Sequence, residues 1–174
     1  MKKFEVAILS GGRGTRVKKY TRNIPKCLIE INGKPFLYHQ LKYLKKNNIK
    51  SVIILVGYLG EKVKSYLEKN IDFIKVKVVS DGKKLLGTGG AVLKSLNYLK
   101  KNFFIIYGDS YLRLNLHDFR KKSKKDFTTM AIFKNYNKYD KSNVEINKSR
   151  NINYYQNQTK KKTILHRLWH FICQ

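Results

Sequence analysis

The sequence predicts an α/β fold built on a largely parallel sheet that helices cover on both faces. Two observations carry this prediction. Short apolar runs alternate with segments whose apolar residues recur at helical spacing, and the runs are apolar throughout rather than at every second residue. Strands of a parallel sheet have this continuous apolar character because both of their faces are buried. With 174 residues the chain has about the length of one domain and can bury a sizeable core.

The elements are expected in a regular order along the chain. The predicted strands cover 4–9, 27–31, 51–56, 76–79 and 103–107, followed by shorter strands at 129–133, 144–146 and 152–155. The predicted helices cover 36–48, the surroundings of 63–67, and a segment through 91–99. Loops at Ser10, Gly57 and Asp109 directly follow strands. Because ligands of such sheets bind beyond the carboxyl ends of the strands, these loops are expected to converge on one crevice.

The net charge of +27 has two explanations. A strongly basic chain suggests a nucleic acid or an anionic membrane as partner. However, the lysines are scattered along the whole chain, and Lys, Asn, Ile, Tyr and Phe are all encoded by A- and T-rich codons. We therefore favour a compositional bias with solvated lysines. The sequence predicts neither a nucleic-acid partner nor a membrane partner.

Cysteine use and hydropathy indicate the compartment. Cys27 and Cys173 are the two cysteines, and they form neither a disulfide framework nor a metal-binding pattern. The apolar run after the first residues is too short for a signal peptide, and no stretch approaches the roughly 20 apolar residues that cross a bilayer. The predicted location is the cytoplasm.

A glycine-rich loop after the first strand is the strongest chemical signal. It reads Leu9-Ser10-Gly11-Gly12-Arg13-Gly14-Thr15-Arg16. Three glycines in four positions allow a tight turn that brings backbone N–H groups close to a phosphate, and Arg16 adds a planar fork that suits phosphate oxygens. The loop lacks the lysine of a Walker A motif and the third glycine of the dinucleotide fingerprint. An ordinary glycine turn is the alternative to a phosphate site.

Three further segments carry candidate functional residues. Lys26 follows Pro25 a short loop after the glycine turn. Residues 85–91 read Leu-Leu-Gly-Thr-Gly-Gly-Ala, which favours a ligand at a helix N-terminus; the alternative is a helix end crowded against the sheet. Asp109 ends a very apolar strand, where a carboxylate suits Mg²⁺; the alternative is a turn or helix-capping aspartate.

Together these motifs resemble those of the nucleotidyltransferases that activate sugar 1-phosphates. The order Gly-Gly-x-Gly-Thr-Arg, Pro-Lys, Leu-Gly-Thr-Gly-Gly-Ala, Gly-Asp is specific, and the resemblance runs from about residue 4 to residue 155. It is greatest to the branch that contains heptose- and mannose-1-phosphate guanylyltransferases. Val17 departs from the usual leucine of the family. The resemblance implies a Rossmann-like, three-layer fold with a mainly parallel, mixed sheet, incomplete at its C-terminus.

The resemblance also implies a reaction and a set of site residues. A nucleoside monophosphate passes from an NTP, with GTP favoured, to a sugar 1-phosphate for cell-surface polysaccharide synthesis, and Mg²⁺ is the expected cofactor. Arg16 would hold the triphosphate, Lys26 would neutralise phosphate charge, and Asp109 would hold the metal. The expected nucleotide-binding residues are Leu9, Ser10, Gly11, Gly12, Gly14, Thr15, Gly87 and Thr88. A non-catalytic nucleotide-binding module and a basic nucleic-acid-binding protein are the alternatives, and homo-oligomerisation is left open.

The end of the chain differs in character from the rest. We divide the sequence into a nucleotidyltransferase region at 1–159 and an aberrant basic tail at 160–174. Back-translation of 162–173 with A/T-rich codons, read one nucleotide later, gives Lys-Gln-Tyr-Tyr-Ile-Asp-Tyr-Gly-Ile-Ser-Phe, which resembles a strand of the family. A reading-frame shift near the lysines at 160–162 is therefore expected, and this form is expected to be inactive or impaired. The alternative is a genuine basic tail that contacts a membrane or a partner.

Overall fold

The computed structural model describes residues 5–15, 23–111, 113–123, 127–134, 136, 144–147, 152–154 and 165–173, and the structural statements below refer to these residues. For 153–154 and 165–173 only the backbone is described. No helix in the described part is long and apolar enough to cross a membrane.

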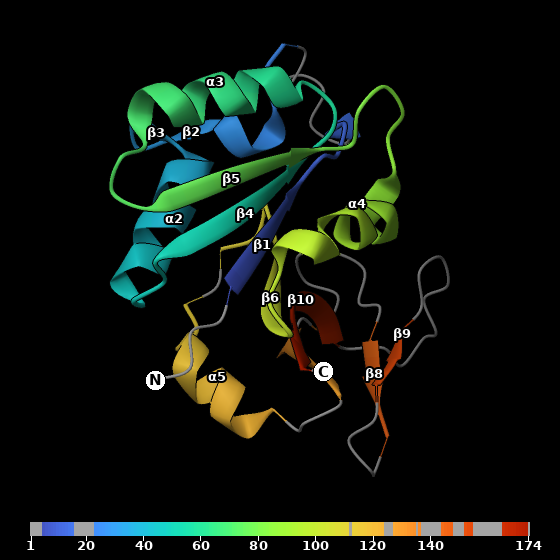
Figure 1. The fold of residues 1–174 in the computed structure, drawn as a ribbon. Coiled ribbons are helices and arrows are strands. Elements are labelled where there is room, and N and C mark those ends of the chain that lie inside the picture. Colours follow the sequence, from blue (N-terminus) through green and yellow to red (C-terminus); the bar gives the residue numbers. More distant parts are fainter. Residues whose placement is uncertain are drawn as a thin grey trace.

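Four parallel strands form the half of the sheet that carries the predicted fold class. They are β1 (Glu5–Ser10), β4 (Ser51–Val56), β5 (Lys75–Ser80) and β6 (Asn102–Tyr107). Their order across the sheet is β5-β4-β1-β6, and all three pairings are parallel (Figure 1). The order reverses between β1 and β6, because the chain moves outward from β1 through β4 to β5 and then returns to the other side of β1. Such a switch point opens a crevice at the carboxyl ends of the two strands.

Helices cover the two faces of these strands, as predicted. The larger core packs helix α2 (Phe36–Lys46), helix α3 (Gly60–Asn70) and helix α5 (Leu116–Lys122) against one face. The smaller core packs helix α4 (Gly87–Ser95) against the other face (Figure 1). The sequence therefore predicts the layers correctly, although it does not predict α5.

The register of β1 shows why its sequence is continuously apolar. Val6 and Ile8 belong to the larger core, whereas Ala7 between them belongs to the smaller one, and all three side chains are fully buried. Successive side chains of a strand point to opposite faces, so a strand that is covered on both faces needs apolar residues at every position.

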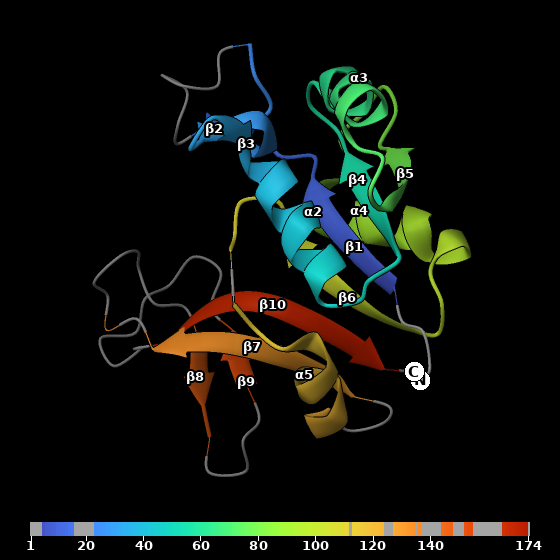
Figure 2. The ribbon, with the colours of Figure 1, turned by 90° about the vertical axis from the view of Figure 1, so that its left-hand side faces the viewer.

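The second half of the sheet is antiparallel. Strand β10 (Leu165–Cys173) pairs along one side with β7 (Thr128–Lys134) and along the other with β6 at one end and β8 (Val144–Ile146) at the other end. Strand β9 (Ile152–Tyr154) pairs with β8. Figure 2 shows β7 and β10 as two long neighbouring strands below the parallel half. The complete sheet is mixed, and the predicted short strands β7, β8 and β9 are confirmed.

The structure corrects the strand predicted at 27–31. Lys26–Leu28 form a 3-10 turn, in which the N–H of Leu28 donates to the carbonyl of Pro25 at 2.8 Å, and only β2 (Glu30–Ile31) follows as strand. This β2 pairs with β3 (Lys34–Pro35) in a hairpin apart from the main sheet. The Asn32-Gly33 turn has φ values of 51° and 73°, which suit a tight two-residue hairpin loop.

The end of the chain also differs from expectation. The sequence suggested that 160–174 stand outside the fold, yet the backbone of Leu165–Cys173 lies in the sheet between β6 and β7. The reason is compositional, since Leu, Trp, Phe and Ile in this segment favour strands and both neighbours offer unpaired edges. The reading-frame hypothesis concerns the gene and stays a prediction.

Candidate functional site

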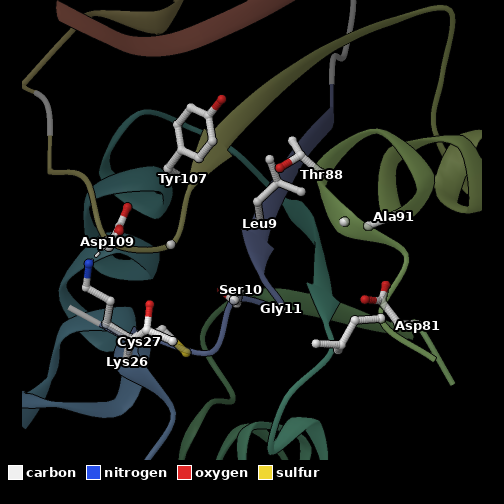
Figure 3. Close-up of a pocket in the computed structure, with 16 residues that line it drawn as sticks. Leu9, Ser10, Gly11, Lys26, Cys27, Asp81, Thr88, Ala91, Tyr107 and Asp109 are labelled. Atoms are coloured by element: carbon white, nitrogen blue, oxygen red, sulfur yellow. Dashed lines mark hydrogen bonds and ion pairs between the residues drawn. The ribbon is translucent and has the colours of Figure 1, made fainter. Parts of the chain in front are cut away.

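A cleft of about 430 Å³ lies at the switch point between β1 and β6. The residues that line it come from the ends of β1 and β6, from the loops after β1, β5 and β6, from the 3-10 turn and from α4 (Figure 3). They are Leu9, Ser10, Gly11, Gly12, Gly14, Thr15, Lys26, Cys27, Asp81, Leu85, Gly87, Thr88, Ala91, Tyr107, Gly108 and Asp109. The structure thus brings together every predicted site residue that it describes. Arg16, predicted to hold the triphosphate, lies outside the described residues.

Glycine keeps the loops at this switch point close to each other. The N–H of Gly108 donates to the carbonyl of Leu9 at 2.8 Å, so the end of β6 is tied to the end of β1. A Cβ added to Gly108 would lie 2.4 Å from Oγ of Ser10 and 2.8 Å from the Leu9 carbonyl oxygen. In contrast, a Cβ at Gly12 would meet nothing within 4 Å, which leaves open space beside that part of the loop.

Lys26 and Asp109 form an ion pair in the cleft. Nζ of Lys26 lies 2.7 Å from Oδ2 of Asp109, although the two residues are 83 positions apart in the chain. The 3-10 turn after Pro25 presents the lysine, and the loop after β6 presents the aspartate (Figure 3). Both side chains are partly exposed, at 37% and 43%, so an incoming ligand can reach either of them.

Gln40 of α2 holds the loop that carries Asp109. Its Nε2 donates to the carbonyls of Tyr107 at 2.9 Å and of Ser110 at 2.8 Å, and the Gln40 side chain is buried. The two carbonyls flank the Gly108-Asp109 pair, so the amide fixes the loop on both sides of the carboxylate. The sequence did not single out Gln40, because a polar residue on the inner face of a helix gives no signal until its partners are known.

The carboxylate of Asp109 fits a divalent cation only together with a phosphate ligand. The ammonium group of Lys26 already lies against it, so the site accepts a positive charge. Among the described residues no cluster of three or more metal-ligating side chains is present. Mg²⁺ is often bound by one or two carboxylates together with substrate phosphates and water. The residues therefore fit Mg²⁺ that arrives with a nucleotide better than a metal held by protein groups alone.

Cys27 lies in the wall of the cleft and is buried. Burial is the largest cause that raises the pKa of its thiol to about 11, and the negative charge of Asp109 acts in the same direction, whereas hydrogen bonding to Ser10 opposes it. The thiol is therefore neutral near pH 7 and unsuited to act as a nucleophile.

We expect this buried thiol to lower the free energy of unfolding at alkaline pH. The pKa of the thiol is higher in the folded than in the unfolded protein. The neutral thiol therefore contributes its full share to the free energy of unfolding below the pKa of the unfolded state, and this share is lost as the pH rises toward 11. Denaturant unfolding between pH 8 and 11 should show this loss, and Cys27→Ala should reduce the slope. An identical slope in the two proteins would contradict the assignment.

Comparison with known proteins agrees with this geometry. Residues 5–149 match the family model described as nucleotidyl transferase. The chain belongs to the nucleotidyl transferase family. Among curated relatives, D-glycero-alpha-D-manno-heptose 1-phosphate guanylyltransferase of Campylobacter jejuni is 36% identical over 141 residues, which cover 81% of this chain and 63% of that protein. A probable glucose-1-phosphate cytidylyltransferase of Bacillus subtilis is 31% identical over 134 residues, covering 64% of this chain and 52% of that protein.

The fold of this nucleotidyl transferase family member is also similar to that of a solved structure. HddC from Yersinia pseudotuberculosis, crystallised in complex with GMP-PN, superposes with a TM-score of 0.83 at 26% identity. The match covers 98% of this chain and 76% of that one. The chain thus spans about two thirds or less of the curated relatives described above, and about three quarters of this structure.

The cleft also contains residues outside the predicted set of site residues, although two of them, Leu85 and Ala91, belong to the predicted ligand-binding segment 85–91. The residues outside that set are Cys27, Asp81, Leu85, Ala91, Tyr107 and Gly108. A usable signal existed for Asp81, because it follows β5 directly, as Asp109 closely follows β6. No comparable signal marked Cys27, whose place in the wall depends on the 3-10 turn.

Proposed function

We propose that this protein transfers a nucleoside monophosphate from an NTP to a sugar 1-phosphate, which yields an NDP-sugar and pyrophosphate for cell-surface polysaccharide synthesis. The observation that carries the proposal is the Lys26–Asp109 ion pair, which shares one cleft with the glycine loop. A cation and a metal-binding carboxylate beside backbone N–H groups are the parts that phosphoryl transfer needs.

The reaction balances without a covalent enzyme intermediate. An oxygen of the sugar phosphate attacks the α-phosphorus of the NTP in line, the bond to the β-phosphate oxygen breaks, and pyrophosphate leaves. Bound Mg²⁺ would neutralise charge on the phosphates. The loop at Ser10, Gly11 and Gly12 would position the nucleotide, Lys26 would neutralise the charge that develops at the α-phosphate, and Asp109 would hold the metal.

GTP is the nucleotide that we favour. The Campylobacter relative is named as a guanylyltransferase, and the Yersinia structure was solved with a guanine nucleotide. The Bacillus relative is named as a cytidylyltransferase, so the family alone does not fix the base.

A pyrophosphate-release screen tests the proposal. Four NTPs are combined with several sugar 1-phosphates and Mg²⁺. The proteins are the 174-residue chain and a chimaera in which residues after 159 are replaced by the matching segment of the Campylobacter relative. We expect release that requires both substrates and is greatest with GTP. NTP binding without release in both proteins would favour a non-catalytic nucleotide-binding module instead.

Removal of the lysine should separate metal binding from nucleotide binding. In Lys26→Met, nucleotide-free Mn²⁺ is expected to bind about 2- to 5-fold more tightly, because an exposed ion pair of up to about 1 kcal/mol no longer competes for Asp109. The same change should weaken NTP binding, because a phosphate-neutralising cation is lost. Electron paramagnetic resonance titration of Mn²⁺ and calorimetric titration of NTP measure the two effects. Lys69→Met, on the distant end of α3, serves as the control. Weaker Mn²⁺ binding in Lys26→Met would contradict the competition.

A further inference from the structure

The cleft has a second carboxylate, at the end away from Lys26 and Asp109. Asp81 follows β5 directly, and Figure 3 shows it across the cleft from the ion pair, with Ser10 and Gly11 between them. Oδ2 of Asp81 accepts a hydrogen bond from the N–H of Leu86 at 3.1 Å. A carboxylate has about four lone-pair positions, so this single bond leaves most of its accepting capacity free.

Among the described residues no cation forms an ion pair with this carboxylate. The chain holds 38 lysines and arginines against 11 acidic residues, so a counter-charge is available almost everywhere on its surface. Lys94 directs its Nζ to backbone carbonyls instead, to that of Ser80 at 2.7 Å and that of Asp81 at 3.2 Å. Lys26, the lysine that lines the cleft, pairs with Asp109 and not with Asp81. A cleft carboxylate that has no ion-pair partner in the described part of such a basic protein indicates a ligand that donates hydrogen bonds.

The absence of a side chain at Gly57 allows this carboxylate to lie close to the glycine-rich loop after β1. A Cβ added to Gly57 would lie 2.9 Å from Oδ2 of Asp81, 2.8 Å from the carbonyl oxygen of Gly11 and 2.7 Å from Cδ2 of Leu85. Two acceptor oxygens and an apolar side chain thus surround one point. Leu85 and Ala91 add apolar surface to this end of the cleft, which suits the face of a flat ring. The negative charge of a triphosphate favours the other end of the cleft, where Lys26 lies. A nucleotide bound in this direction has its base beside Asp81.

We propose that Asp81 selects guanine as the base, an inference that rests on the proposed function. The Watson–Crick edge of guanine carries two adjacent donors, N1–H and N2–H₂, and a carboxylate accepts from both. Adenine offers an acceptor at N1, cytosine an acceptor at N3, and uracil a single N–H between two carbonyls. Each of these bases would place an oxygen or nitrogen lone pair against the negative charge. A buried or half-buried polar site rejects such analogues strongly.

The test is the substitution Asp81→Asn, with GTP, ITP and XTP titrated in the presence of Mg²⁺. The amide keeps an oxygen for the N–H of Leu86, so the loop stays supported, and it replaces one acceptor by an N–H₂ donor. GTP affinity should fall about 10- to 100-fold, as expected for the loss of a hydrogen bond to a charged group. Affinity for XTP, which has a carbonyl in place of the 2-amino group, should rise and exceed that for GTP. ITP, which lacks the 2-amino group, should bind the unmodified protein about 10-fold more weakly than GTP.

The outcomes separate this inference from the proposed function. Asp72→Asn removes the same charge at an exposed site before β5 and should leave all three affinities unchanged. If Asp81→Asn melts normally and keeps its preference for GTP over XTP, Asp81 merely supports the loop and the inference fails, while the proposed function stands. If no NTP binds the unmodified protein at millimolar concentration, the proposed function fails and the inference fails with it.

Discussion

Asp109→Ala is expected to reduce nucleotidyl transfer in the chimaera by about 1,000-fold or more in kcat/KM. The carboxylate lies in the loop after the apolar strand β6, lines the cleft and already contacts a positive group at 2.7 Å. Loss of a metal ligand removes several kcal/mol of charge stabilisation, and each 1.36 kcal/mol is a factor of ten in rate. Pyrophosphate release over a range of Mg²⁺ concentrations measures the effect.

Two comparisons make this result interpretable. The side chain of Asp109 is 43% exposed, so its loss should leave the melting temperature nearly unchanged, and Asp72→Ala should affect neither stability nor rate. Nucleotide-dependent Mn²⁺ binding by the 174-residue chain should also weaken in Asp109→Ala. Turnover close to normal at every Mg²⁺ concentration would contradict the assignment of Asp109 as the metal ligand.

Gly108→Ala is expected to cost about 2–4 kcal/mol of folding stability, the largest effect that we expect from one added methyl group. The new Cβ would lie 2.4 Å from Oγ of Ser10 and 2.8 Å from the carbonyl oxygen of Leu9. The carbonyl belongs to the backbone of β1 and also accepts the N–H of Gly108, so it cannot move aside without a break between β1 and β6. Denaturant unfolding followed by circular dichroism gives the loss directly.

The matched control is Gly12→Ala in the neighbouring loop. A Cβ there meets nothing within 4 Å, and Gly12 is not among the glycines with positive φ. Its folding stability should change by less than about 0.5 kcal/mol, the usual range for an unconstrained surface position. Equal losses in the two variants would show that crowding at the switch point does not explain the effect.

The sequence alone determined the parallel half of the sheet and much of the cleft. The run 52–56 within β4 is apolar at every position because both of its faces are covered, and this pattern does not depend on knowing its partners. The carboxyl ends of parallel strands meet at one edge, so the position of Ser10 and Asp109 after two such strands is enough to place them together. The family follows from the same local motifs, and the comparison with known proteins confirms it.

Only the tertiary structure decided which distant groups touch. The pairing of Lys26 with Asp109 depends on a 3-10 turn where the sequence predicted a strand, because two or three apolar residues next to a proline do not distinguish the two. The two hydrogen bonds of Gln40, the position of Asp81 beside Gly57, and the pairing of β10 with β6 and β7 have no local signature. Each joins residues far apart in the chain, and such contacts are set by the packing of whole elements rather than by the residues on either side.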